Sequence, residues 1–273
     1  MSTYIENFKR FRPLLNELVS RDIKIKYRRS IMGVLWTLLN PLLMMIVLSI
    51  VFSNLFKFDI ENFPLYLLSG QVIFNFYSDS TNNAMGAIIF NAPLIKKVYV
   101  PKYLFVVSRV VSSFINLMAA FTALLFVMVA TRAELHWTAL LSFIPLALLV
   151  MFSLGVSLFL SAVVVKFRDI MHFYSVFITA LMYLTPVIYP MSILPQWMKY
   201  VVLANPITNY LIMFRDTMLN NSIPGGMNLL IGGIEAILAM VIGLIVFYKK
   251  QDDFILKNVP WRISRLWKSS RFP

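Results

Sequence analysis

Two acidic residues, Asp79 and Glu235, occur inside long apolar stretches of this sequence. A carboxylate is costly within hydrocarbon, so such a group faces the interior of a helix bundle, water or a partner. Each acid could therefore line a polar channel or relay protons, and each could instead anchor two helices through a hydrogen bond. Asn75 and Asn82 recur with Asp79 at helical spacing, which favours a polar or aqueous face there. For Glu235 we favour the structural anchor.

A basic block precedes the first long apolar run, and it contains a single acid, Asp22. Arginine pairs with two phosphate oxygens at once, so the block could hold a diphosphate headgroup. The candidates for such a site are Arg21, Lys24, Arg28 and Arg29. The same residues would also serve as plain cytoplasmic anchors of a membrane span.

Aromatic residues are frequent in the first and fifth apolar runs. A sugar ring stacks its C–H face on an aromatic plane, so an aromatic pore suits an extended glycan, although aromatics in membrane helices more often face lipid or the core. Together with the polar residues of the second run, they give the channel candidates Trp36, Phe52, Phe56, Asn75, Asp79, Phe173, Tyr174, Phe177, Tyr183 and Tyr189.

The sequence contains none of the enzyme motifs that we sought. It has no GxxxxGK(S/T) phosphate loop, no GxSxG and no HExxH. With no cysteine and with His136 and His172 as its two histidines, it offers neither a thiolate site nor a histidine cluster for a metal. We therefore expect no catalytic residue, no bound cofactor and no metal in this chain.

The composition indicates an integral membrane protein. Hydrophobic residues make up 59% of the 273 residues and charged residues 14%, whereas a soluble domain carries about 25% charged residues. The net charge of +13 is placed in blocks beside apolar runs rather than in a stripe on a folded domain. Anionic membrane lipids are therefore the expected partner, and nucleic acid is not.

The apolar runs predict an all-α protein with six transmembrane helices, because each is close to or longer than the roughly 20 residues needed to span a membrane. The expected spans are about 31–56, 65–90, 103–131, 135–165, 170–190 and 227–248.

The segments outside the spans are expected to have distinct roles. Residues 1–30 would form a cytoplasmic N-terminus in which an amphipathic helix, starting at Pro13, lies in the membrane interface or packs on protein. Residues 91–102 would form a compact loop, and residues 191–226 short helices that re-enter the outer leaflet. Residues 249–273 would form a basic cytoplasmic tail.

Six spans place both termini on one side of the membrane. All but four of the 25 lysines and arginines then fall on that side, and the four exceptions are Lys57, Arg132, Lys199 and Arg215. Because basic residues accumulate in cytoplasmic loops, both termini are expected to be cytoplasmic.

Three separated stretches of the chain carry a resemblance to a known family. They are RDIKIKYRRSIMGVLWTLLNPLL (21–43), NAPLIKKVYVPK (91–102) and KFRDIMHFYSVFITALMYLTPVIYP (166–190), the last followed by ANPITNYLIMFRD (204–216). In this order they resemble the membrane subunits of type-2 ABC exporters of cell-surface polysaccharides, the permeases for O-antigen, capsule and teichoic acid. The resemblance covers about residues 14–259.

This resemblance implies a homodimer in the bacterial inner membrane, with two ATP-binding-cassette subunits that bind ATP and Mg²⁺. The coupling residues would be Pro93, Leu94, Ile95, Lys96, Lys97, Val98, Tyr99 and Pro101. The basic block would meet the diphosphate of a lipid-linked polysaccharide, and the glycan would leave through a channel between the first and fifth spans. Residues 191–226 would cover the outer mouth.

Two other functions stay open at this point. An ABC permease for a drug or another small lipophile would have less need of an aromatic channel and of a basic phosphate site. A membrane-embedded enzyme or scaffold of envelope synthesis would work without any ATPase, and the missing catalytic motifs count against it.

Overall fold

The structure is a computed structural model that describes residues 2–27, 32–56, 60, 62–97 and 100–251. Arg28, Arg29, Val98 and Tyr99 and most of the basic tail lie outside the described residues. The described residues are almost entirely helical and contain no strand. The helices are α1 (Ser2–Tyr27), α2 (Trp36–Phe56), α3 (Phe63–Met85), α4 (Ala87–Phe90), α5 (Ala92–Lys97), α6 (Tyr103–Ala130), α7 (Phe143–Val164), α8 (Ile170–Leu184), α9 (Gln196–Leu203), α10 (Pro206–Met218) and α11 (Gly226–Lys250), with short 3-10 turns at Gly33–Leu35, Trp137–Ser142 and Met191–Ile193.

Three stretches of the described chain are long and apolar enough to cross a membrane, namely Tyr103–Ala130, Trp137–Val164 and Gly226–Lys250. Trp36–Phe52 and Ile170–Leu184 are apolar but shorter. The prediction of an all-helical membrane protein is confirmed at this level, and the count of six spans stays a prediction.

Several helices end elsewhere than the apolar runs suggest, for local reasons. The fifth run was expected to continue to residue 190, but α8 ends at Leu184 because Thr185 is extended (φ −102°, ψ 132°) ahead of Pro186. The second run, 65–90, divides at Gly86 into α3 and α4. Helix α1 does not start at Pro13 but continues through it from Ser2. Gly33 adopts a left-handed φ of +47°, so α2 starts at Trp36 rather than at the start of its apolar run.

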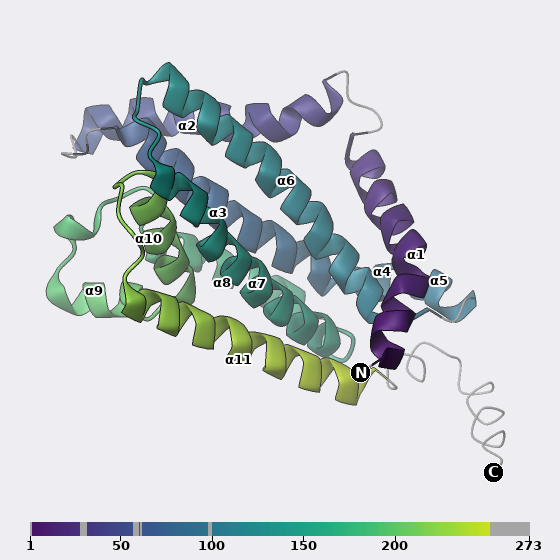
Figure 1. Cartoon of the computed structure of the whole chain (residues 1–273). Helices are drawn as coiled ribbons and strands as arrows, with labels where there is room; N and C mark the ends of the chain where they lie inside the picture. The colour runs from purple at the N-terminus through teal and green to yellow at the C-terminus, as the bar shows by residue number, and fades with distance from the viewer. Residues whose placement is uncertain (1, 28–31, 57–59, 61, 98–99, 252–273) are drawn as a thin grey trace, which may run out of the picture.

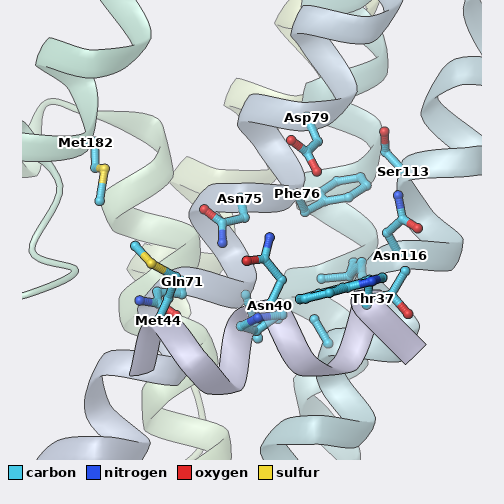
Figure 2. Close-up of a pocket in the computed structure, with 15 residues that line it drawn as sticks. Thr37, Asn40, Met44, Gln71, Asn75, Phe76, Asp79, Ser113, Asn116 and Met182 are labelled. Carbon is cyan, nitrogen blue, oxygen red and sulfur yellow. The ribbon is translucent and has the colours of Figure 1, made fainter. Parts of the chain in front are cut away.

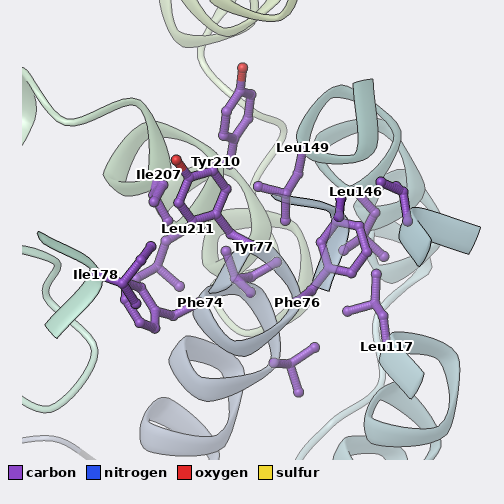
Figure 3. Close-up of a cluster of buried hydrophobic side chains, with 14 of the residues drawn as sticks. Phe74, Phe76, Tyr77, Leu117, Leu146, Leu149, Ile178, Ile207, Tyr210 and Leu211 are labelled. Atoms are coloured by element: carbon purple, nitrogen blue, oxygen red, sulfur yellow. The ribbon is translucent and has the colours of Figure 1, made fainter. Parts of the chain in front are cut away.

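Helix α3 lies at the centre of the fold, between α6 and α7, and α11 packs along α7 (Figure 1). Side chains of α3, α6, α7, α8 and α10 are among those that meet in one buried cluster around α3, part of which Figure 3 shows. Within it Tyr77 stacks on Phe152 with ring centroids 5.8 Å apart. The polar face of α3 is therefore held in a fixed rotation by a well-packed apolar face.

Glycines bring α7 and α11 into backbone contact. A Cβ on Gly155 would overlap the backbone of Ala239 and Met240, and a Cβ on Gly243 would overlap the carbonyl of Gly155. Small residues allow such close approach between membrane helices, where dispersion contacts replace the hydrophobic effect as the source of stability.

Helix α1 lies across the end of the bundle at which α6 begins and α11 ends (Figure 1). Leu15 and Leu18 are the buried apolar side chains among the described side chains of α1, and the Lys102 ammonium at the start of α6 donates to the Gln251 carbonyl after α11. The start of α6 is therefore packed on α1 and bonded to the end of α11.

Candidate functional site

A cavity of about 680 Å³ lies between α2, α3 and α6, with Met182 of α8 at its edge (Figure 2). Its lining comprises Trp36, Thr37, Asn40, Pro41, Met44, Gln71, Val72, Asn75, Phe76, Asp79, Ser113, Asn116, Leu117, Ala120 and Met182.

Each of the three helices supplies its polar side chains at helical spacing. Gln71, Asn75 and Asp79 recur every fourth residue, so they share one face of α3. Thr37 and Asn40 are three residues apart on α2, as are Ser113 and Asn116 on α6. The result is a concave surface in which amides, hydroxyls and one carboxylate lie among apolar side chains of the same helices.

Two of the lining groups are buried without a hydrogen-bond partner among the described residues. These are Oε1 of Gln71, whose residue is 4% exposed, and Oγ of Ser113, whose residue is 2% exposed. Most buried polar atoms are paired, because leaving one unsatisfied costs about 1–3 kcal/mol. Both residues line the cavity, but these two atoms are themselves buried, so a polar occupant would satisfy them only after each side chain turns toward the cavity.

Trp36, Asn75 and Asp79 are the channel candidates that the structure brings together in this cavity. Their role in transport stays a prediction. The sequence patterns overlooked the remaining polar lining residues, Thr37, Asn40, Gln71, Ser113 and Asn116. The spacing of Gln71 four residues before Asn75 was a visible signal for one of them.

The other channel candidates lie elsewhere. Tyr174 is buried against α3, with its hydroxyl 3.5 Å from that of Tyr77. The Tyr189 hydroxyl donates to the Tyr183 carbonyl. Phe52 packs partly buried against the core, and the side chain of Phe56 lies outside the described residues. Phe173, Phe177 and Tyr183 are exposed on α8.

A charge cluster joins α1, α6 and the start of α5. The Asp22 side chain is only 4% exposed, and its Oδ1 lies 3.2 Å from Nη2 of Arg21 and 3.3 Å from Nη1 of Arg109. Nη2 of Arg21 also donates to Oδ1 of Asn91 at 3.0 Å. Arg21, a candidate for the lipid diphosphate, is thus engaged by a protein carboxylate, whereas Lys24 is exposed.

The described coupling candidates are five residues of α5 and Pro101 shortly after it, and α5 lies at the same end of the bundle (Figure 1). Pro93, Lys96 and Lys97 are exposed, whereas Leu94 and Ile95 pack partly buried against the core. Pro101 is half-buried, and its carbonyl accepts from the Leu104 amide at 3.1 Å. The segment therefore presents one polar face outward and holds the other against the bundle.

A buried arginine fixes the opposite end of α3. The positive-inside count treats Arg215 only as an outer-side charge, but it is 7% exposed. Its guanidinium donates to Oγ of Ser69 and to the carbonyls of Tyr66, Pro186 and Val187, at 3.1, 2.9, 2.7 and 3.3 Å respectively. These bonds attach the turn after α8 to α3 and α10. Glu235 is half-buried on α11 and does not line the cavity.

Comparison with known proteins agrees with the resemblance in the sequence. The chain is 28% identical over 247 residues to the O-antigen export system permease protein RfbA of Klebsiella pneumoniae, covering 88% of this chain and 93% of the relative. The protein of the same name from Myxococcus xanthus is 27% identical over 256 residues, which cover 93% and 98%. The polysialic acid transport protein KpsM of Escherichia coli is 21% identical over 241 residues, which cover 87% and 93%.

The family model described as ABC-2 type transporter matches residues 13–219. The match includes the charge cluster, α5, every residue that lines the cavity, and Arg215. The family expected from the sequence is thereby confirmed, and the chain belongs to the ABC-2 type transporter family.

Proposed function

We propose that this chain is the permease subunit of an ATP-driven exporter that moves a lipid-linked polysaccharide from the cytoplasmic to the outer side of the bacterial inner membrane. The observation that carries the proposal is the cavity, in which amides and hydroxyls lie beside two aromatic rings and aliphatic side chains. A hydroxyl-rich substrate would pair with the amides and hydroxyls, whereas a lipophile would leave them without partners. Relatives that are named for O-antigen export and polysialic acid transport support the same class of substrate.

The proposed membrane arrangement has six spans, formed by α2, α3 with α4, α6, α7, α8 and α11. The end of the bundle that carries α1, α5 and the C-terminal end of α11 faces the cytoplasm. The accumulation of lysine and arginine in these segments supports that orientation. Helices α9 and α10 with the residues after α8 then lie towards the outer leaflet, in the region expected to cover the outer mouth.

The functional unit is proposed to be a homodimer with two ATP-binding subunits. The exposed side of α8 combines Phe173, Val176 and Phe177 with the polar Ser175 and Thr179. A second copy of the chain would accommodate that mixture better than lipid tails would.

The ATP-binding subunit would contact α5, whose exposed Lys96 and Lys97 project from the cytoplasmic end. The basic block would hold the lipid diphosphate, with Lys24 as its exposed member among the described residues.

The experiment that tests this proposal is a mild-detergent purification of the chain from its host, with every co-purifying protein identified and counted. We expect a subunit with a phosphate-binding loop at a one-to-one ratio, and loss of the glycan from the cell surface when the gene for this chain is deleted. A monodisperse chain without such a subunit would contradict the proposal, as would a surface glycan that is unaffected by the deletion. ATPase stimulation by lipophilic drugs, without any effect of the deletion on the glycan, would favour the small-lipophile alternative.

A further inference from the structure

We infer that the cavity between α2, α3 and α6 is a subsite for an uncharged sugar ring, and that Gln71 and Ser113 select such a ring over one that carries a carboxylate or phosphate. The inference rests on the proposed function and adds to it the chemical class of the sugar.

The charges of the lining favour a neutral occupant. Of the fifteen lining residues one is ionisable, the acid Asp79, and none is a lysine or arginine. An anionic group that leaves water loses its hydration at a high cost, and neutral amides and hydroxyls replace only part of that hydration unless a cation is also present. Those lining residues supply no cation, so a uronate or a phosphate would lose hydration without an ionic partner there.

The unpartnered buried atoms favour a hydroxyl group. Oε1 of Gln71 is an acceptor and requires a donor, and a sugar hydroxyl supplies one once the side chain turns toward the cavity. An ionised carboxylate only accepts hydrogen bonds, so its negative oxygens would repel Oε1 of Gln71 instead of bonding to it. Oγ of Ser113 both donates and accepts, which matches the dual character of a hydroxyl group.

The remaining lining supplies surfaces for the ring itself. Trp36 of α2 and Phe76 of α3 contribute aromatic rings to the lining. Asn40 and Asn116 add amides from α2 and α6 (Figure 2). A cavity of about 680 Å³ falls within the roughly 300–1,000 Å³ of ordinary small-molecule sites. The cavity therefore has room for a sugar ring and a mixture of stacking planes and hydrogen-bonding groups to hold it.

The chain contains no cysteine, so a single introduced thiol can report on occupancy. Ala120→Cys places the thiol in the cavity, and Glu134→Cys places it on the exposed connection after α6. The complex purified from its host is placed in nanodiscs, and the rate of labelling by a small water-soluble thiol reagent is measured. The probes are maltoheptaose, which is neutral, and oligogalacturonate of the same length, which is acidic.

We expect maltoheptaose to slow the labelling of Ala120→Cys at least fivefold, and oligogalacturonate to have less than a twofold effect. Ser113→Ala and the near-isosteric Gln71→Glu should each weaken protection by maltoheptaose by about tenfold, the usual scale for losing a buried hydrogen bond. Labelling of Glu134→Cys should be the same in all cases, which shows that the probes do not change the reagent itself, and an unchanged melting temperature shows that the variants are folded.

Equal or better protection by oligogalacturonate would overturn the inference, as would protection by neither probe or full protection in both variants. Display of the glycan on the surface of the host, measured in parallel, separates this inference from the proposed function. Normal display without protection refutes the subsite alone, whereas display that does not depend on this chain refutes the proposed function itself.

Discussion

The guanidinium carbon of Arg215 lies 3.5 Å from the ring centroid of Tyr66, so a cation on α10 is stacked on an aromatic ring at the start of α3. The same guanidinium donates to the carbonyls of Pro186 and Val187, in the turn after α8. Gly70 provides the space, because a Cβ there would lie 2.9 Å from Nη2 of Arg215. One side chain thus holds three separate parts of the chain together.

Replacing Arg215 by methionine should destabilise the fold by about 3 kcal/mol or more, because a buried charged donor is lost and several carbonyls are left unpaired. The measurement is thermal unfolding in detergent, with Arg168→Met, an exposed arginine, as the control. A melting temperature equal to that of the control would show that the contacts around Arg215 contribute little.

The contributions of Asp22 and Arg109 to the stability of the fold should be coupled, because the two side chains form an ion pair. The single variants Asp22→Asn and Arg109→Gln should each lower stability, and the double variant should cost less than their sum, with a coupling of about 1–3 kcal/mol. Glu17→Gln, an exposed acid on the same helix, is the matched control. Additive effects of the two changes would mean that the ion pair does not attach α1 to α6.

The close contact between α7 and α11 should tolerate no added methyl group at Gly243. Gly243→Ala should destabilise the protein by a few kcal/mol, since its Cβ would overlap the Gly155 carbonyl. Gly233→Ala, on the same helix with nothing within 4 Å of its added Cβ, should be neutral or slightly stabilising because alanine favours helix. Similar melting temperatures for the two variants would argue against this packing.

The exposed lysines of α5 should matter for coupling rather than for folding. Lys96→Glu combined with Lys97→Glu should abolish glycan display on the cell surface while leaving the melting temperature nearly unchanged, as is usual for surface substitutions. Lys249→Glu, at the end of α11 on the same side, is the control and should leave display intact. Normal display in the double variant would show that coupling does not depend on the charges of α5.

The sequence patterns predicted the long apolar helices well, because run length alone determines them. The expected span 103–131 corresponds to α6. The expected span 227–248 corresponds to α11, which begins one residue earlier and ends two residues later than expected. The sequence patterns gave wrong helix ends where a helix ends inside an apolar run, as at Thr185 before Pro186 and at Gly86. The apolar content of a run does not indicate where such a helix ends, because the backbone conformation of one or two residues determines it.

The site was predictable on one helix and unpredictable across helices. The spacing of Asn75 and Asp79 indicated a polar face on α3. The rotation of α2 and α6 about their axes depends on packing between helices. The sequence patterns therefore could not predict that Asn40 and Ser113 face the same cavity as Asn75 and Asp79. The contacts of Arg215 with Tyr66 and of Asp22 with Arg109 are long-range, and no periodicity in the sequence reveals them.

The most direct test of the account is transport by the purified complex in proteoliposomes that contain a lipid-diphosphate-linked glycan. We expect ATP-dependent movement of the glycan to the far leaflet. We also expect loss of that movement in Ala120→Trp, which fills the cavity, but not in Ala147→Trp, which is exposed on α7. Glycan movement without ATP, or unchanged movement in Ala120→Trp, would contradict ATP-driven export through this cavity.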